Sequence, residues 1–235
     1  MQPKVLIAAP ISKHKDYIIH EWIPYVVSMP YENKEILLVD NSADSDWHLG
    51  LIDTYGINIL HVNPQGKSNV EYMCLSQNVI RQFVIQNNFE YLMSIECDVF
   101  PPHDIINYLM CYGVPIISVP YMVAQGEQSE ICMSVIDGYI EDTNNRHVGT
   151  FEGYVRTNGQ LAQVDSCGLG CTLIHRSIIN RNPFRFMQGQ ATHSDTFFYI
   201  DCKNKGISVF LDTSIICRHE NQSWKQFSEY NNISH

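Results

Sequence analysis

Short apolar runs alternate with longer segments of helical periodicity along the first half of the chain. The runs cover residues 4–9, 35–39 and 58–62, and segments with helical spacing lie between them. A strand that is apolar throughout is buried on both faces, as in a parallel sheet with helices on both sides. The pattern predicts an α/β fold with a mainly parallel, Rossmann-like central sheet in a single domain.

A fourth apolar run, at residues 90–95, carries two acids at its end. Glu96 and Asp98 follow the run directly, and Pro101 and Pro102 come soon after. Because proline cannot extend a central ladder, we expect the strand to stop here. Residues two apart on a strand point the same way, so both carboxylates are expected together at the carboxyl end of the sheet.

The rest of the chain completes the predicted order of elements. Ser68 and Glu71 form a capping box at the start of a long helix. Further helices are predicted at 103–111, 175–180 and 194–205, and further strands at 114–120 and 207–211. From 125 to 164, β-rich segments and polar turns predict a small insertion, including a hairpin of 152–156 with 161–165 around Asn158-Gly159.

Composition is that of one globular domain and narrows the function classes. The chain has 235 residues, of which 45% are hydrophobic and 17% charged, enough to bury a sizeable core. A formal net charge of −10 with only 15 basic residues argues against a broad nucleic-acid surface but leaves a local basic patch open. The eight cysteines are expected to be reduced, and Cys167 with Cys171 carry little weight as zinc ligands.

The chain is expected to lie in the cytoplasm and to have no transmembrane segment. Its start has the pattern of a first strand rather than that of a signal peptide. The longest apolar stretch, residues 114–124, contains two prolines and is shorter than the roughly 20 residues that a membrane-spanning helix needs.

Glu96 and Asp98 are the strongest candidates for chemistry. Hard divalent cations prefer oxygen ligands, and in nucleotide chemistry they are held by one or two carboxylates together with substrate phosphates. Open α/β sheets bind ligands at the carboxyl ends of their strands, where these acids are expected. The alternative is that the acids only solvate the strand end or cap the next helix.

A series of short motifs runs along nearly the whole chain. They are the first strand's end at residues 8–12, then Val39-Asp-Asn-Ser42, Ser76-Gln-Asn78, Glu96-Cys-Asp98, Asp165-Ser-Cys-Gly-Leu-Gly170, His193-Ser-Asp195 and Asp212-Thr-Ser-Ile-Ile-Cys-Arg-His219. Their order resembles GT-A fold glycosyltransferases, particularly the family 2-like enzymes that use a nucleotide sugar and a divalent metal. The resemblance implies a nucleotide-sugar-binding half at 1–120, an acceptor-binding half at 121–219 and a C-terminal tail at 220–235.

The resemblance also implies a nucleotide-sugar site. Its residues are Pro10, Ile11, Ser12, Asp40, Asn78, Arg81, Glu96, Cys97 and Asp98. Asp40 is expected to accept a hydrogen bond from a base N–H, and the alternative is that it caps the next helix. Arg81 is either a partner of the diphosphate or a residue on a solvated helix face.

Three of the matching positions imply a metal site for Mn²⁺ or Mg²⁺. Glu96-Cys97-Asp98 looks like the D-x-D element of the family, with Asp98 as the direct ligand. Glu stands where the family has Asp, so Glu96 is expected to reach ribose or metal-bound water, or the metal itself. His219 matches the position of a third ligand in related enzymes, and the alternative is a surface histidine.

Asp195 resembles the acid that deprotonates the acceptor hydroxyl in inverting enzymes of this family. The alternative is an ordinary helix start, with Ser194 as the cap and Asp195 favoured by the helix dipole. The loop with Asp165, Gly168, Leu169 and Gly170 is expected to hold hydroxyls of the sugar or the acceptor. Trp224 covers a sugar or acceptor ring, or else belongs to the core or rim.

The expected function is a metal-dependent, inverting transfer of sugar from a UDP- or GDP-type donor to an acceptor hydroxyl. A glycan, a lipid-linked sugar and a hydroxymethylated base in phage-type DNA all remain open as acceptors. For a phage-encoded enzyme the location would be the host cytoplasm. One alternative is a non-catalytic nucleotide-sugar-binding or carbohydrate-binding domain. The other is a sugar-phosphate nucleotidylyltransferase, disfavoured because residues 10–15 contain no glycine-rich loop.

Overall fold

An eight-stranded sheet forms the centre of the protein in the computed structural model, which describes residues 2–44, 46–125, 128–131, 133–134 and 161–220. Its strand order is β3 (Asn58–His61), β2 (Lys34–Asp40), β1 (Val5–Ile11), β4 (Tyr91–Ile95), β12 (Cys171–His175), β6 (Ile116–Ser118), β13 (Val209–Asp212) and β10 (Leu161–Val164). Only β12 and β10 run antiparallel to their neighbours. The predicted α/β fold with a mostly parallel sheet is confirmed.

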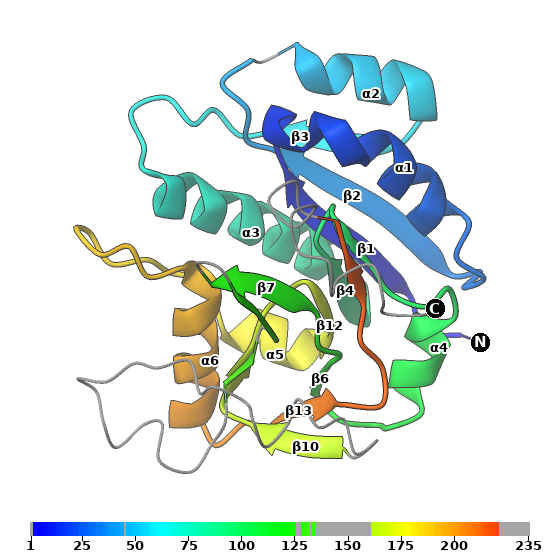
Figure 1. The fold of residues 1–235 in the computed structure, drawn as a ribbon, viewed down its shortest axis with the longest axis vertical. Helices are drawn as coiled ribbons and strands as arrows, with labels where there is room; N and C mark the ends of the chain where they lie inside the picture. Colours follow the sequence, from blue (N-terminus) through cyan, green and yellow to red (C-terminus); the bar gives the residue numbers. More distant parts are fainter. Residues whose placement is uncertain (1, 45, 126–127, 132, 135–160, 221–235) are drawn as a thin grey trace.

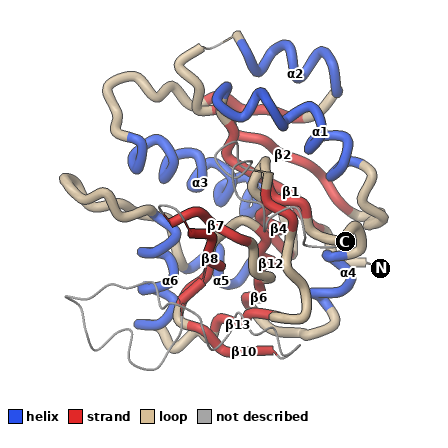
Figure 2. Tube along the Cα trace, in the orientation of Figure 1, coloured by secondary structure: helices blue, strands red, loops and turns tan. Residues whose placement is uncertain are grey.

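Helices cover both faces of this sheet, as Figures 1 and 2 show. The helices α1 (Asp16–Val27), α2 (Trp47–Tyr55) and α4 (Ile105–Met110) pack on one face, and α3 (Asn69–Gln86), α5 (Arg176–Arg181) and α6 (Ser194–Asn204) on the other. Along β1, Val5, Ile7 and Ala9 face the first layer, while Leu6 and Ala8 face the second. This double burial explains why the strand is apolar throughout.

The order of the strands places a crevice between β1 and β4. The chain adds β2 and then β3 on one side of β1, after which α3 returns it to the other side, where β4 pairs with β1. The carboxyl ends of both strands therefore lie at a topological switch point, where open α/β sheets bind ligands. A single turn of 3-10 helix, η1 (Lys13–Lys15), follows β1 at this edge.

Smaller strand pairs surround the main sheet. They are β5 (Val99–Phe100) with β14 (Arg218–His219), β9 (Met133–Ser134) with β11 (Ser166–Cys167), and β7 (Met122–Gln125) with β8 (Gln128–Ile131). The expected hairpin partner at 152–156 lies outside the described residues. The other arm, β10, pairs with β13 along the edge of the main sheet.

The local predictions near the acids need one correction. Strand β4 ends at Ile95, and Glu96 to Asp98 form a turn in which the Val99 N–H donates to the Glu96 carbonyl at 2.9 Å. The prolines end β5, not β4, so the two acids do not share a pleat. By contrast, the capping box of Ser68 and Glu71 at the start of α3 is confirmed.

The described helices offer no stretch with the length and apolarity that crossing a bilayer demands. The seven cysteines that the structure describes form no disulfide with one another, and all of them except Cys111 are buried.

Candidate active site

A cavity of about 290 Å³ opens at the crevice between β1 and β4. Residues from six segments form its polar wall: Ser12 and Lys15 after β1, Asn41 after β2, Gln77 of α3, Glu96 and Asp98 after β4, His193, Ser194 and Asp195 at the start of α6, and His219 of β14. Apolar side chains including Ile80, Leu92, Leu169 and Phe184 line the remainder. The cavity thus gathers three carboxylates beside a lysine and two histidines.

Asp98 lies at the centre of this group and is 2% exposed. Its Oδ2 accepts from the Lys15 ammonium and lies 3.2 Å from His219 Nε2. Burial opposes ionisation, but the hydrogen bond and charge of His219 and the charge of Lys15 outweigh it and hold the pKa of Asp98 below its usual value. Asp98 is therefore an anion that depends on positively polarised partners.

The pairing of β5 with β14 brings His219 to Asp98. Val99 lies opposite His219 in this antiparallel pair, and the Glu220 N–H donates to the Asp98 carbonyl at 2.7 Å. Residues about 120 positions apart in sequence thus meet through two-residue strands that no periodicity reveals.

Glu96 stands beside Asp98 in a different protonation state. Burial, and after it the negative charge of Asp98, raises the pKa of Glu96 to about 7. Two carboxylates in one cavity cannot both ionise cheaply without a cation nearby. Near neutral pH, Glu96 is thus able to hold or release a proton.

Asp195 lies in the first turn of α6 and also lines the cavity. Burial raises the pKa of Asp195. The Thr196 N–H donates to Asp195 Oδ1 at 2.7 Å, and this hydrogen bond opposes the increase. The N-cap is His193 rather than the expected Ser194, whose hydroxyl donates to Gln77 Oε1 instead. This bond fixes the start of α6 against α3.

The glycine loop positions His219 indirectly. A Cβ added to Gly170 would lie 2.4 Å from a ring carbon of Tyr121, and the Tyr121 ring meets the His219 ring edge-on at 5.3 Å between centroids. Leu169 lines the cavity, whereas the Gly168 carbonyl accepts from the Thr172 hydroxyl at 3.0 Å. Asp165 forms an ion pair with Lys203 at 3.0 Å and is not part of the cavity wall.

Several expected nucleotide contacts lie on the cavity wall and others do not. The expected residues on the wall are Pro10, Ile11, Ser12, Glu96, Cys97 and Asp98. Asn78 instead bonds the backbone of Phe184, and Arg81 donates to the carbonyls of Ile179 and Asn180 at the end of α5. Both residues are thus occupied in packing α3 against the chain around α5, and Trp224 lies outside the described residues.

Asp40 is fully buried and takes no part in the wall of either cavity. Its Oδ1 accepts from the Ser42 N–H and hydroxyl, and its Oδ2 lies 2.8 Å from His61 Nδ1. The expected contact between Asp40 and a base therefore has no support from its position. Asn41, the next residue, lines the cavity instead.

A second, larger cavity of about 910 Å³ adjoins the first. Ser12 and Asn41 line both. The larger cavity continues past Lys13 of η1, Asp44 after β2, His61 at the end of β3, Asn63 and Lys67 after it, and Tyr72 of α3. The two cavities together form one elongated site along the carboxyl edge of the sheet.

Six polar wall residues were not predicted as ligand contacts: Lys15, Asn41, Gln77, Ser94, His193 and Ser194. Helical phase offers a signal for Gln77, since Met73, Gln77 and Ile80 recur at spacings of four and three and line the same cavity. Asn78 is one position out of that phase.

The donor types around Asp98 suit a divalent cation, but Asp98, Glu96 and His219 are not a group whose ligand atoms all lie within 4.8 Å of one another. Asp98 and Glu96 offer carboxylate oxygens, which manganese and magnesium prefer, and His219 offers an imidazole nitrogen directed at Asp98. The Lys15 ammonium contacts the same carboxylate oxygen as His219. Binding of a cation there requires Lys15 to leave Asp98.

No known family model matches the sequence, and no curated protein matches it either. Solved structures do match. TarS 1-349 from S. aureus in complex with UDP-GlcNAc has a TM-score of 0.60 at 11% identity, covering 95% of this chain and 61% of that one. The mannosyltransferase PcManGT from Pyrobaculum calidifontis in complex with GDP-Man and Mn²⁺ has a TM-score of 0.57 at 12% identity, covering 92% and 56%.

This chain accordingly spans about three fifths of the length of these two matched structures. Another structure of S. aureus TarS is similar as well, with a TM-score of 0.54 at 10% identity, covering 91% of this chain and 35% of that one. The likenesses confirm a GT-A-like glycosyltransferase fold for this chain.

Proposed function

We propose that this protein, which has a GT-A-like fold, transfers a sugar from a nucleotide-sugar donor to an acceptor hydroxyl. The observation that carries the proposal is the gathering of Glu96, Asp98 and Asp195 with Lys15 and His219 in one cavity at the switch point of the sheet. Anionic and cationic groups of this kind suit the cleavage of a sugar–diphosphate bond.

The nucleotide-sugar extends across both cavities in this proposal. The nucleoside occupies the larger cavity, the diphosphate passes Ser12 and Asn41 where the cavities join, and the sugar lies in the smaller cavity beside Leu169 and Asp195. Pro10, Ile11 and Cys97, which were expected from the sequence to contact the nucleotide sugar, line the smaller cavity. Two matched structures contain UDP-GlcNAc and GDP-Man respectively, which supports a nucleotide sugar of the UDP or GDP type.

A Mn²⁺ or Mg²⁺ ion would be held by Asp98 with His219, and with Glu96 directly or through water. When bound, the ion supplies positive charge to the departing nucleoside diphosphate. Lys15 turns from Asp98 to the diphosphate and adds a second positive charge there. The ion also favours the ionised form of Glu96, whose pKa is otherwise raised.

Asp195 acts as the general base in this proposal. It takes the proton of the acceptor hydroxyl while that oxygen bonds to the anomeric carbon, and the bond from this carbon to the diphosphate oxygen breaks. Burial raises the pKa of Asp195, and a base is most effective when its pKa approaches the working pH. Attack from the face opposite the diphosphate inverts the configuration of the sugar. A glycan, a lipid-linked sugar and a hydroxymethylated DNA base each present a suitable hydroxyl.

The test is release of nucleoside diphosphate from a panel of UDP- and GDP-sugars, with Mn²⁺ or Mg²⁺ and without acceptor. We expect slow, metal-dependent hydrolysis of one sugar donor, and its loss in Asp98→Asn. Asp201→Asn is the matched control. Asp201 lies on α6, forms an ion pair with Arg185 at 2.8 Å and is not part of the cavity wall.

Each other outcome contradicts the proposal in a different way. Binding of a nucleotide sugar without turnover, even with the candidate acceptors added, identifies a binding domain. Release of pyrophosphate from a nucleoside triphosphate and a sugar phosphate identifies a nucleotidylyltransferase. Failure to bind any nucleotide sugar removes the proposed substrate class.

A further inference from the structure

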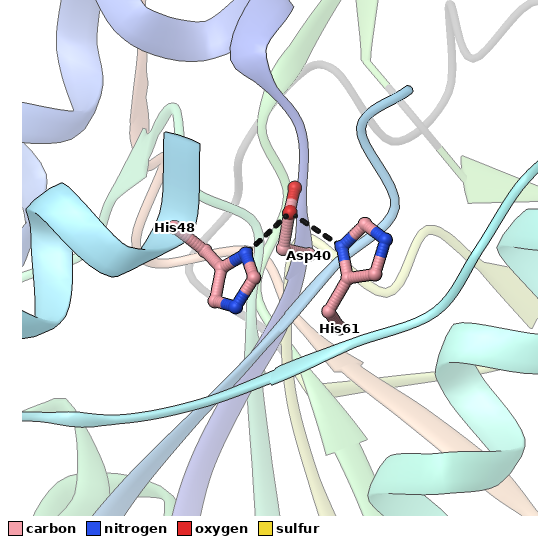
Figure 3. A group of neighbouring side chains, drawn as sticks. All are labelled: Asp40, His48 and His61. Atoms are coloured by element: carbon pink, nitrogen blue, oxygen red, sulfur yellow. Dashed lines mark hydrogen bonds and ion pairs between the residues drawn. The ribbon is translucent and has the colours of Figure 1, made fainter. Parts of the chain in front are cut away.

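A second cluster of acid and imidazole groups lies at the same edge of the sheet, behind the larger cavity. It consists of Asp40 at the end of β2, His61 at the end of β3 and His48 in the first turn of α2 (Figure 3). Asp40 and His61 are paired in the register of adjacent parallel strands. Residues from three separate elements thus converge because of the fold and not because they are close in sequence.

The geometry of the cluster is compact. Asp40 Oδ2 lies 2.8 Å from His61 Nδ1 and 3.3 Å from His48 Nδ1, and the three atoms lie within 4.8 Å of one another. The two imidazole rings are stacked at 11° with 5.1 Å between centroids. The Asp40 side chain is fully buried, and those of His48 and His61 are 12% and 21% exposed.

One nitrogen in the cluster forms no hydrogen bond with the described residues. Both Nδ1 atoms are directed at one carboxylate oxygen, but only His61 forms a hydrogen bond with it. His48 Nδ1 is buried and has no hydrogen-bond partner among the described residues. A buried polar atom that forms no hydrogen bond is destabilising, and a cation between the three side chains would remove this cost.

We propose that Asp40, His48 and His61 bind a zinc-class transition metal ion, separately from the ion expected at Asp98. Two imidazoles and one carboxylate suit zinc, whereas magnesium and calcium prefer oxygen ligands alone. The hydrogen bonds of Ser42 to Asp40 Oδ1 hold the carboxylate from outside, as supporting residues of metal sites do.

The fit requires a small local movement. Ligand atoms at about 2.0–2.1 Å from a tetrahedral zinc are about 3.3–3.4 Å apart, which is already the separation between His48 and Asp40. The His61 to Asp40 separation must widen by roughly half an ångström from its hydrogen-bonded value. The metal would take the place of the proton shared by His61 Nδ1 and Asp40 Oδ2. A fourth coordination position of the metal would stay open to water.

This ion would connect α2, β2 and β3 beside the larger cavity. His61 itself lines that cavity, and Asn41 and Ser42 follow Asp40 directly. Occupancy therefore stabilises the loop after β2 that forms the cavity wall. The proposal does not depend on sugar transfer, since the cluster shares no residue with the Asp98 group.

The experiment measures Zn²⁺ binding by the chelator-treated full-length protein in competition with a chromophoric chelator, and uses Co²⁺ as a spectroscopic probe. We expect one tight site per chain, with the intense visible bands of four-coordinate cobalt. His48→Ala and His61→Ala should each weaken binding at least about a hundredfold and remove these bands. The thermal midpoint of the wild type, but not of these variants, should rise with Zn²⁺.

Two controls separate this site from others. His20→Ala removes an exposed histidine of α1 that pairs with Tyr55 and is not one of the three proposed ligands, and should leave Zn²⁺ affinity unchanged. Asp98→Asn should also retain the tight site. The proposal is overturned if the wild type binds no zinc tightly, if the cobalt spectrum shows thiolate bands, or if the two histidine variants bind as the wild type does; the cluster is then a hydrogen-bonded group only.

Discussion

Two buried aspartates, Asp40 and Asp98, lie at one edge of the sheet, and their carboxylates have different basic partners. Each has an oxygen facing two basic side chains: His61 and His48 for Asp40, and His219 and Lys15 for Asp98. Asp98 lines a cavity and Asp40 lines none. Burial of a carboxylate therefore does not by itself identify a substrate contact.

The nature of the partners separates the two acids. Lys15 has a long side chain that is 30% exposed, so its ammonium can leave Asp98 for another anion. The partners of Asp40 are two histidines with shorter side chains, His61 from the adjacent strand and His48 from α2, which are 21% and 12% exposed. Asp98 is thus placed for exchange with a ligand, and Asp40 for holding the chain together.

The largest expected effect comes from replacing Asp195, the proposed general base. Asp195→Asn should lower the rate of sugar transfer about 10²- to 10⁴-fold, because the amide cannot take the acceptor proton. Affinity for the nucleotide sugar should change little. Steady-state kinetics with calorimetric binding measures both, and Asp201→Asn on the same helix is the control. An unchanged transfer rate would remove Asp195 as the base.

Glu96 should make stability fall as pH rises through the neutral range. Its pKa is about 7 in the folded protein and 4.5 ordinarily, so the folded state binds the extra proton between these values. Stability is then lost from about pH 4.5 to 7 and stays low above. Glu96→Gln should recover on the order of 2–3 kcal/mol at pH 7.5 but little at pH 4.5, in urea unfolding with a chelator present.

Glu71 provides a control of opposite sign. Hydrogen bonds from the Ser68 backbone and side chain lower the pKa of Glu71, so its contribution is present above its ordinary pKa and lost as pH falls through the folded value. Glu71→Gln should therefore be destabilised near neutral pH. Parallel curves for wild type and Glu96→Gln would show that Glu96 does not carry a raised pKa.

Much of the fold was predictable from sequence because its strands are buried on both faces. The apolar runs at 35–39 and 58–62 became β2 and β3 nearly to the residue. The insertion of antiparallel β12 between β4 and β6 was not predictable, since periodicity shows that a strand is buried but not which strand it pairs with.

The candidate site also contains residues that sequence predicted and residues that it did not. The motif order placed Asp98, Asp195 and His219 on one list, and the fold brings them to one cavity. Arg81 bonds carbonyls 98 and 99 residues away, on a segment whose position depends on tertiary packing. Asp40, at the end of β2, is buried and lines neither cavity, so a position at a strand end did not by itself identify a cavity contact.

Lys15 should matter less than Asp195 because a bound metal shares its role. Lys15→Ala should lower turnover about 10- to 100-fold by removing positive charge from the departing diphosphate. Lys15→Arg should restore part of it. Lys4→Ala is the control, since Lys4 pairs with Glu35 at 2.8 Å and lies outside both cavity walls. If Lys15→Ala turns over as the wild type does, Lys15 is only a structural partner of Asp98.

The smallest expected effect comes from the glycine that leaves room for Tyr121. In Gly170→Ala the new Cβ would meet the Tyr121 ring at 2.4 Å, so the ring must move, at a cost of about 1–3 kcal/mol. Because Tyr121 packs against His219, affinity for Mn²⁺ should fall as well.

Gly50→Ala is the matched substitution, in α2 with no atom within 4 Å of the added Cβ. It should be neutral or stabilise by up to about 1 kcal/mol, since alanine favours helix. Denaturant unfolding compares the two variants, and manganese titration measures the effect on the cavity. Equal stability would mean that Tyr121 has room to move, and unchanged Mn²⁺ affinity would mean that its position does not set that of His219.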